Sequence, residues 1–222
     1  MTELILQALF SGVLIGSVYA LVALGLALAF GAMRIINLAH GELVLLAAYM
    51  AYFTEVRTGL NPYAAIPLAL LAVLLVSWGL VFLVSRIREH RELNSLILTF
   101  AIGIILTNAI LLVFTSDVRT TGSATLQDAV SLGDLFAMRG EIVAFFVSLL
   151  LMGFLWWWLK SSWYGRAVRA VSSNRDAARL MGINPARIET ASFLVAGTLA
   201  AFAGVALYTC LLYTSPSPRD RG

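Results

Sequence analysis

Six long stretches of apolar residues divide this chain of 222 residues, and they constrain its fold more than any other feature. A helix needs about 20 residues to cross the hydrocarbon of a bilayer, at about 1.5 Å per residue. In lipid every backbone amide needs a partner within the protein, and the alternation of a transmembrane strand is absent, so we expect helices. The stretches run roughly over residues 4–30, 38–53, 62–84, 95–115, 141–159 and 190–209.

The second stretch is short and carries Glu42 near its start, so it fits a full span, a tilted span or a re-entrant segment. The distribution of Lys and Arg favours a full span. With the N-terminus outside and six crossings, ten basic residues fall in inner loops and three in outer loops, as expected when positive charge stays inside. The sequence therefore predicts an all-α, polytopic transmembrane helical bundle with about six transmembrane helices.

Composition agrees with a membrane protein and argues against several other classes. The chain is 60% hydrophobic and 12% charged, whereas soluble domains carry about 25% charged residues. The basic residues lie in a few short stretches between apolar runs, which indicates membrane orientation rather than nucleic-acid binding. A single cysteine, Cys210, excludes an internal disulfide and a cysteine-based metal site. We expect no cleavable signal peptide, because Met1–Glu3 is not a basic n-region.

Residues 210–222 differ in character from the rest of the chain. Their sequence resembles the in-frame translation of a transposon-end sequencing adapter, although a genuine Pro/Ser-rich tail is the alternative. We therefore expect a transmembrane domain over residues 1–209, followed by a non-native tail over residues 210–222. On this interpretation the natural gene continues past Thr209.

No sequence pattern for an enzyme is present. His40 is followed by Gly-Glu and His90 by Arg-Glu, so neither begins an H-E-x-x-H zinc motif. The chain also has no Walker A pattern and no G-x-S-G nucleophile element. We expect a protein without enzymatic activity, metal or cofactor of its own. A secondary transporter or a channel remains an alternative from a different class.

The inner loop over residues 160–189 predicts a short helix from Asn174 to Met181. Ser173 and Asp176 fit a capping box, and Gly182 supplies a left-handed stop. Asn184-Pro185 fits the start of the next helix. A helix of two turns is marginal alone, so it needs a surface to pack on. That surface is either the chain itself or a cytoplasmic partner.

Polar residues gather where the second apolar stretch enters the membrane. Asn37, His40 and Glu42 lie within six residues, and ionisable groups in a membrane usually face a cavity or a partner. They either hold helices in register or line a pathway. His40 and Glu42 are two positions apart, so they cannot share a helix face. Asn108 lies midway along the fourth stretch and fits an interhelical hydrogen bond or a substrate contact.

Small residues recur at every fourth position in two stretches and predict close helix packing. The residues concerned are Gly12, Gly16 and Ala20 in the first stretch and Ala196, Ala200 and Gly204 in the sixth.

The stretch over residues 25–52 resembles the LivH-type branched-chain amino acid ABC permeases, and it is also similar to the related urea permeases. The specific part is the run Asn37-Leu38-Ala39-His40-Gly41-Glu42. The loop over residues 165–184 is similar as well, and the resemblance covers nearly all of residues 4–209. Asp176-Ala177-Ala178-x-x-x-Gly182 looks like the "EAA" signature of ABC importer permeases, with Asp in place of Glu.

The resemblance implies the permease subunit of an ATP-driven importer in a bacterial cytoplasmic (inner) membrane, with branched-chain amino acids as substrates and urea or a short-chain amide as the alternative. It implies a second homologous permease, two ATPase subunits that use ATP and Mg, and a periplasmic or lipid-anchored solute-binding protein. The expected coupling helix to the ATPase comprises Asn174, Arg175, Asp176, Ala177, Ala178, Arg179, Leu180, Met181 and Gly182. The candidate pathway residues are Asn37, His40, Glu42 and Asn108.

Overall fold

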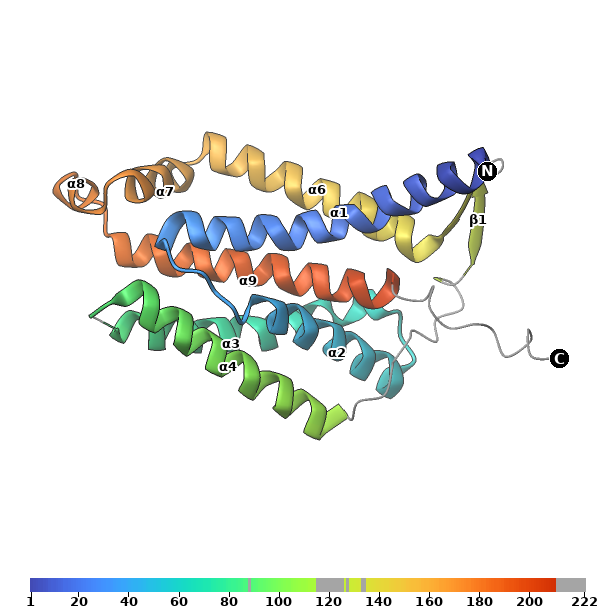
Figure 1. Ribbon diagram of the computed structural model, residues 1–222, viewed down its shortest axis with the longest axis horizontal. Coiled ribbons are helices and arrows are strands. Elements are labelled where there is room, and N and C mark those ends of the chain that lie inside the picture. The colour runs from blue at the N-terminus through green and yellow to red at the C-terminus, as the bar shows by residue number, and fades with distance from the viewer. Residues whose placement is uncertain (88, 115–125, 127, 133–134, 211–222) are drawn as a thin grey trace.

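The computed structural model describes residues 1–87, 89–114, 126, 128–132 and 135–210. Each of the six apolar stretches contains a helix, so the predicted helical bundle is confirmed (Figure 1). The long helices are α1 (Thr2–Met33), α2 (His40–Thr58), α3 (Ile66–Arg86), α4 (Arg91–Phe114), α6 (Arg139–Ser161) and α9 (Pro185–Cys210). The short helices are the 3-10 turn η1 (Pro62–Ala65), α7 (Trp163–Ser173) and α8 (Arg175–Leu180).

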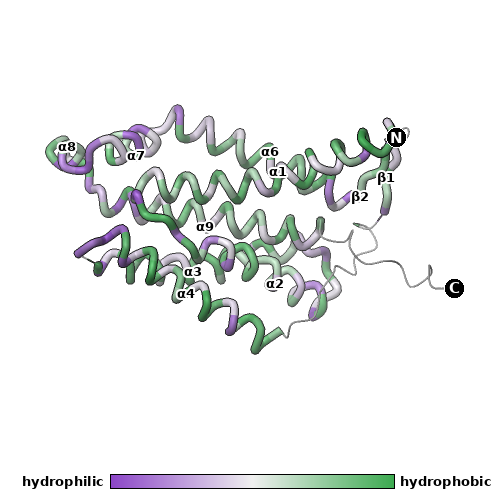
Figure 2. The backbone as a smooth tube through the Cα atoms, in the orientation of Figure 1, coloured by the Kyte–Doolittle hydropathy of each residue, from purple (hydrophilic) through white to green (hydrophobic). Residues whose placement is uncertain are grey.

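Five segments are long and apolar enough to span a membrane in the part of the chain that the structure describes: α1, η1 with α3, α4, α6 and α9. Apolar residues predominate along all of them (Figure 2). Their loops place α7 and α8 at one end of the bundle, called here the α8 end (Figure 1). The opposite end carries the antiparallel strands β1 (Ala129–Leu132) and β2 (Leu135–Met138), and is called the hairpin end.

Helix α2 begins inside the bundle rather than at its edge. His40 Nε2 lies 3.2 Å from the carbonyl oxygen of Val22. Val22 is eleven residues before the end of α1 at Met33, which is about 16 Å along the helix. The hydrocarbon is about 30 Å thick, so α2 begins near its middle.

The second crossing is therefore composite. Residues 34–39 enter from the α8 end without forming a helix, and α2 continues to the hairpin end (Figure 1). Because the chain leaves at the end opposite to the one where it entered, the re-entrant alternative is wrong. Helix α2 is absent from the apolar spans because three charged residues, Glu42, Glu55 and Arg57, lie within its 19 residues.

Helix α9 occupies the centre of the bundle and packs on α1, α2 and α3 (Figure 1). Ala196 and Ala200 are buried, and a Cβ atom at Gly204 would overlap the carbonyl oxygen of Val44. The predicted close packing of this stripe is confirmed. The stripe on α1 behaves differently, because a Cβ atom at Gly12 or Gly16 would meet nothing within 4 Å. The prediction of close packing there is wrong for the described part of the chain.

The two ends of the bundle are tied by local contacts. At the hairpin end, Gln7 Nε2 donates to the Phe136 carbonyl at 2.7 Å, and Phe136 N donates to Gln7 Oε1 at 3.0 Å. At the α8 end, the Tyr164 hydroxyl on α7 lies 2.6 Å from Ser192 Oγ on α9. Burial raises the pKa of Tyr164, and the Ser192 hydrogen bond lowers it by a smaller amount. Helix α7 was not predicted from the sequence.

Candidate functional site

The polar residues at the start of α2 separate into two groups. Asn37 and His40 are each 4% exposed. The Asn37 Oδ1 atom accepts from the Ala39 amide at 3.1 Å, and the His40 ring contacts the Val22 carbonyl of α1. Both side chains therefore fix the start of α2 by bonding backbone groups, and neither lines a pocket with Glu42.

Glu42 faces the other way, toward α4. Its Cγ atom lies 3.5 Å from the position of a Cβ atom built on Gly103. Glu42 and Asn108 line one pocket of about 440 Å³ on this face, called here the α2–α4 pocket. The Asn108 amide donates to the Ile104 carbonyl at 2.7 Å within its own helix. The remaining lining residues are Leu38, Phe100, Gly103, Ile104 and Thr107.

Thr99 supports this pocket, although sequence reasoning did not identify it. Its fully buried hydroxyl accepts from the Leu38 amide at 3.3 Å and donates to the Leu96 carbonyl at 3.1 Å. Non-helical backbone at membrane depth is tolerated only where its polar groups are satisfied by protein or water. Thr99 therefore helps the non-helical residues 34–39 to reach the middle of the bundle.

Aromatic rings join α2 to α4 on the hairpin side of the pocket. The Tyr49 ring packs at a tilt of 31° against Phe114 with centroids 4.8 Å apart, and Tyr52 contacts the same ring edge-on at 6.5 Å. Tyr52 also meets Tyr208 of α9 at 6.4 Å. These contacts hold α2, α4 and α9 together between the pocket and the hairpin end.

The predicted short helix in the inner loop is present as α8, and its ends match the prediction to within one residue. Its cap differs. Asn174, rather than Ser173, is the N-cap, since Asn174 Oδ1 accepts from the amides of Asp176 and Ala177 at 3.0 Å each. Ser173 is instead the last residue of α7. Sequence reasoning predicted Ser173 as the cap because it did not recognise that Ser173 belongs to helix α7.

The end of α8 follows the prediction. Gly182 adopts a left-handed conformation with φ of 80°, and Ile183 N donates to the Ala178 carbonyl at 3.0 Å. Asn184 Oδ1 then accepts from Arg187 N at 3.4 Å, and Pro185 begins α9 as predicted. Such a stop leaves α8 projecting from the bundle (Figure 1).

Helix α8 carries three charged residues, Arg175, Asp176 and Arg179, and two large apolar side chains are exposed at its C-terminal end. Leu180 and Met181 are 89% and 81% exposed, whereas Ala178 is buried. A shallow groove of about 430 Å³ runs between α7 and α8, and Met181 forms part of its lining. The other apolar residues of the groove include Trp163, Ala167, Ala170, Ala177 and Ile183.

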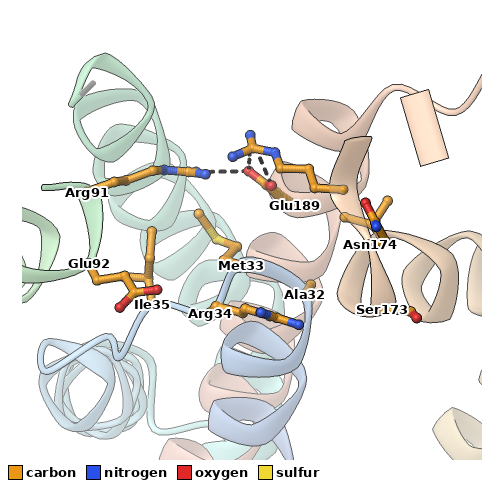
Figure 3. Close-up of a pocket in the computed structure, with 11 residues that line it drawn as sticks. Ala32, Met33, Arg34, Ile35, Arg91, Glu92, Ser173, Asn174 and Glu189 are labelled. Atoms are coloured by element: carbon orange, nitrogen blue, oxygen red, sulfur yellow. Dashed lines mark hydrogen bonds and ion pairs between the residues drawn. The ribbon is translucent and has the colours of Figure 1, made fainter. Parts of the chain in front are cut away.

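A buried carboxylate anchors the base of α8. Glu189 on α9 is 3% exposed. Its Oε2 atom lies 2.8 Å from Arg91 Nη2, and its Oε1 atom lies 3.1 Å from Arg175 Nη2 (Figure 3). Sequence reasoning missed this triad because the three residues are up to 98 positions apart, and no local pattern pairs them.

The fold and these sites define a polytopic helical membrane protein with a pocket containing Glu42 and Asn108 near mid-depth and a short projecting helix at one end. The chain belongs to the family of permease components of branched-chain amino acid transport systems, whose sequence model matches residues 8–220. No solved structure shows significant similarity to it.

Individual relatives agree with this family assignment. The chain is 30% identical to the high-affinity branched-chain amino acid transport system permease protein BraD of Pseudomonas aeruginosa, and the match covers 91% of this chain and 70% of BraD. It is also 30% identical to LivH of Escherichia coli K12, with the same coverage. A probable LivH of Methanocaldococcus jannaschii is 28% identical over 86% of this chain and 62% of its own length.

Proposed function

We propose that this chain is the permease subunit of an ATP-driven ABC importer for branched-chain amino acids and that it forms half of the translocation pathway. The observation that carries the proposal is the projecting helix α8 with its exposed Leu180 and Met181. The names of the relatives supply the substrate class. The chain itself performs no chemistry in this proposal.

The α2–α4 pocket is the proposed half-pathway. Glu42, Thr107 and Asn108 lie on an open face of the subunit at the depth of the hydrocarbon. Charged and polar groups at that depth face a partner or a water-filled cavity rather than lipid. A second homologous permease placed against this face encloses the pathway, and the Glu42 carboxylate then attracts the ammonium group of an amino acid.

Helix α8, with its caps, is the proposed coupling helix over residues 174–182. Large apolar side chains that project into water usually mark a binding surface. A groove in a cytoplasmic ATPase subunit covers Leu180 and Met181 in the assembled importer, and each of two permeases engages one ATPase. Closure of the ATPase pair around ATP and Mg moves α8 and switches access across the membrane.

The charge distribution supports an N-terminus outside the cell. Nine described Lys and Arg residues lie at the α8 end and two, Arg57 and Arg139, at the hairpin end. The sequence places ten basic residues in inner loops and three in outer loops. One of each, Arg88 and Arg119, lies outside the described residues. Positive charge accumulates on the cytoplasmic side, so α8 faces the ATPases in a bacterial inner membrane. The hairpin end faces a periplasmic or lipid-anchored binding protein.

Charged substitutions on α8 test the proposal. We expect Leu180→Glu with Met181→Glu to abolish co-purification of the ATPase subunits and ATP-driven leucine uptake in proteoliposomes. Both side chains are exposed, so folding should be unaffected. Leu60→Glu is the matched control, because Leu60 is also exposed but lies at the hairpin end. Normal assembly of the α8 double variant would refute the docking surface.

Uptake assays separate the remaining alternatives. Leucine uptake that requires ATP and both ATPases supports the importer, whereas equal uptake in vesicles without ATPases indicates a secondary transporter or a channel. Competition with urea tests the substrate class. Urea transport without leucine transport would replace the amino acid with a short amide.

A further inference from the structure

We propose that the Arg91–Glu189–Arg175 triad transmits movement of α8 to α4, with Glu189 as a positioning residue for transport. This inference rests on the proposed function, because it assigns a route from the coupling helix to the α2–α4 pocket. Arg175 is the first residue of α8, and Arg91 is the first residue of α4. Glu189, in the second turn of α9, binds both (Figure 3).

Helix α4 is the element best placed to respond. It packs on α2 and α3 at one side of the bundle (Figure 1), and only 17% of its apolar window is buried, against 72% for the central helix α9. The same helix carries Thr107 and Asn108 opposite Glu42. A tilt of α4 at its Arg91 end therefore changes the width of the pocket without disturbing the core around α9.

The surroundings of the triad allow such movement. A cavity of about 430 Å³ borders it toward Arg34 and Asn174, and another of about 270 Å³ borders it toward Ser85 and Thr190. The arginine side chains are therefore held by charge-assisted hydrogen bonds more than by close packing. Such bonds are directional and roughly twice as strong as neutral ones.

Glu189 joins the two arginines directly. One carboxylate holds two guanidinium groups, and its Oε2 atom accepts from both Arg91 and Arg175, at 2.8 Å and 3.2 Å. A neutral side chain at this position leaves the two positive groups facing each other. They then separate, and α8 loses its ionic connection to α4.

Coupling measurements on the complete importer test this link. The variants are Glu189→Gln and Arg91→Gln, assembled with both ATPases and reconstituted in proteoliposomes. We expect ATPase co-purification and ATP hydrolysis within twofold of wild type, with at least a fivefold fall in leucine transported per ATP hydrolysed. Arg91→Lys keeps the positive charge and should recover more than half of the lost coupling.

Arg187→Gln is the matched control. Arg187 lies exposed in the first turn of α9 and forms no ion pair with any residue that the structure describes, so its neutralisation should leave the transport ratio unchanged. Wild-type coupling in Glu189→Gln would overturn the proposal. So would a parallel loss of assembly, hydrolysis and uptake, which indicates a purely structural role. A wild-type importer without ATP-dependent uptake would instead refute the proposed function itself.

Discussion

His40 and Glu42 project from opposite sides of α2, so that the imidazole contacts Val22 of α1 while the carboxylate lies against Gly103 of α4. The first side chain is buried among helices of the same subunit, and the second faces an open pocket. Two neighbouring ionisable residues thus have separate tasks. His40 positions the start of α2, and Glu42 is the residue that we propose to contact the solute.

Glu42→Gln should reduce leucine uptake about tenfold or more, since a substrate ammonium group loses its counter-charge and about 1.4 kcal/mol corresponds to a factor of ten. Assembly with the ATPases should be unchanged, because the pocket is distant from α8. Transport in proteoliposomes measures the effect. Glu3→Gln is the control, as Glu3 is an exposed carboxylate at the start of α1. Wild-type uptake in Glu42→Gln would remove Glu42 from the pathway.

Asn174→Ala should destabilise α8 by about 1 kcal/mol, the usual cost of losing an N-cap. Two amides lose their acceptor, and α8 has only six residues to compensate. Faster hydrogen exchange of residues 175–180 would reveal the change. Ser173→Ala should leave exchange unaltered, because Ser173 ends α7. The reverse ranking of the two variants would contradict the cap assignment.

Gly204→Ala should lower the free energy of unfolding by about 1–3 kcal/mol, the typical cost of overpacking a core. The added methyl group overlaps the Val44 carbonyl and the Ala47 side chain. Thermal unfolding in detergent measures the loss. Gly79→Ala on α3 is the matched substitution, since its Cβ atom meets nothing within 4 Å. It should be neutral or slightly stabilising, and an equal loss in both variants would argue against α9 as the tightly packed centre.

Cysteine labelling should establish the orientation. In a Cys210→Ser background, which removes the single cysteine, a membrane-impermeant maleimide should label Leu60→Cys in intact cells. It should label Arg187→Cys only after permeabilisation. Both positions are exposed and lie at opposite ends of the bundle. The opposite pattern would place α8 outside and exclude its docking on cytoplasmic ATPases.

The positions of the long helices could be predicted because hydrophobic length determines which segments enter lipid, with the distribution of Lys and Arg deciding for α2. The end of α8 was also predictable, since Gly182 has a local conformational reason to stop a helix. Of the run from Asn37 to Glu42, Leu38 and Glu42 line the α2–α4 pocket. The adapter interpretation of residues 210–222 stays a prediction, as residues 211–222 lie outside the described part of the chain.

Other features depend on contacts between distant parts of the chain. The depth at which α2 begins could not be predicted, because the non-helical course of residues 34–39 depends on Thr99, which is 61 positions beyond Leu38. The Glu189 triad and the opposite directions of His40 and Glu42 toward specific neighbours likewise require the assembled bundle. Helix α7 lies within a stretch that the sequence analysis treated as a loop. Because α7 extends to Ser173, the N-cap of α8 is Asn174, one residue later than predicted.

The central position of α9 has a consequence for biosynthesis. Helices α1, α2 and α3 enter the bilayer well before the ribosome has made the segment that fills the space between them. During that interval Gly25, Ala47 and Ser77 lack the α9 residues Ala196, Gly204 and Gly197 that lie against them in the finished bundle, so lipid must cover them. A chain stopped before Pro185 therefore has five long helices, α1, α2, α3, α4 and α6, but lacks the central helix on which α1, α2, α3 and α6 pack.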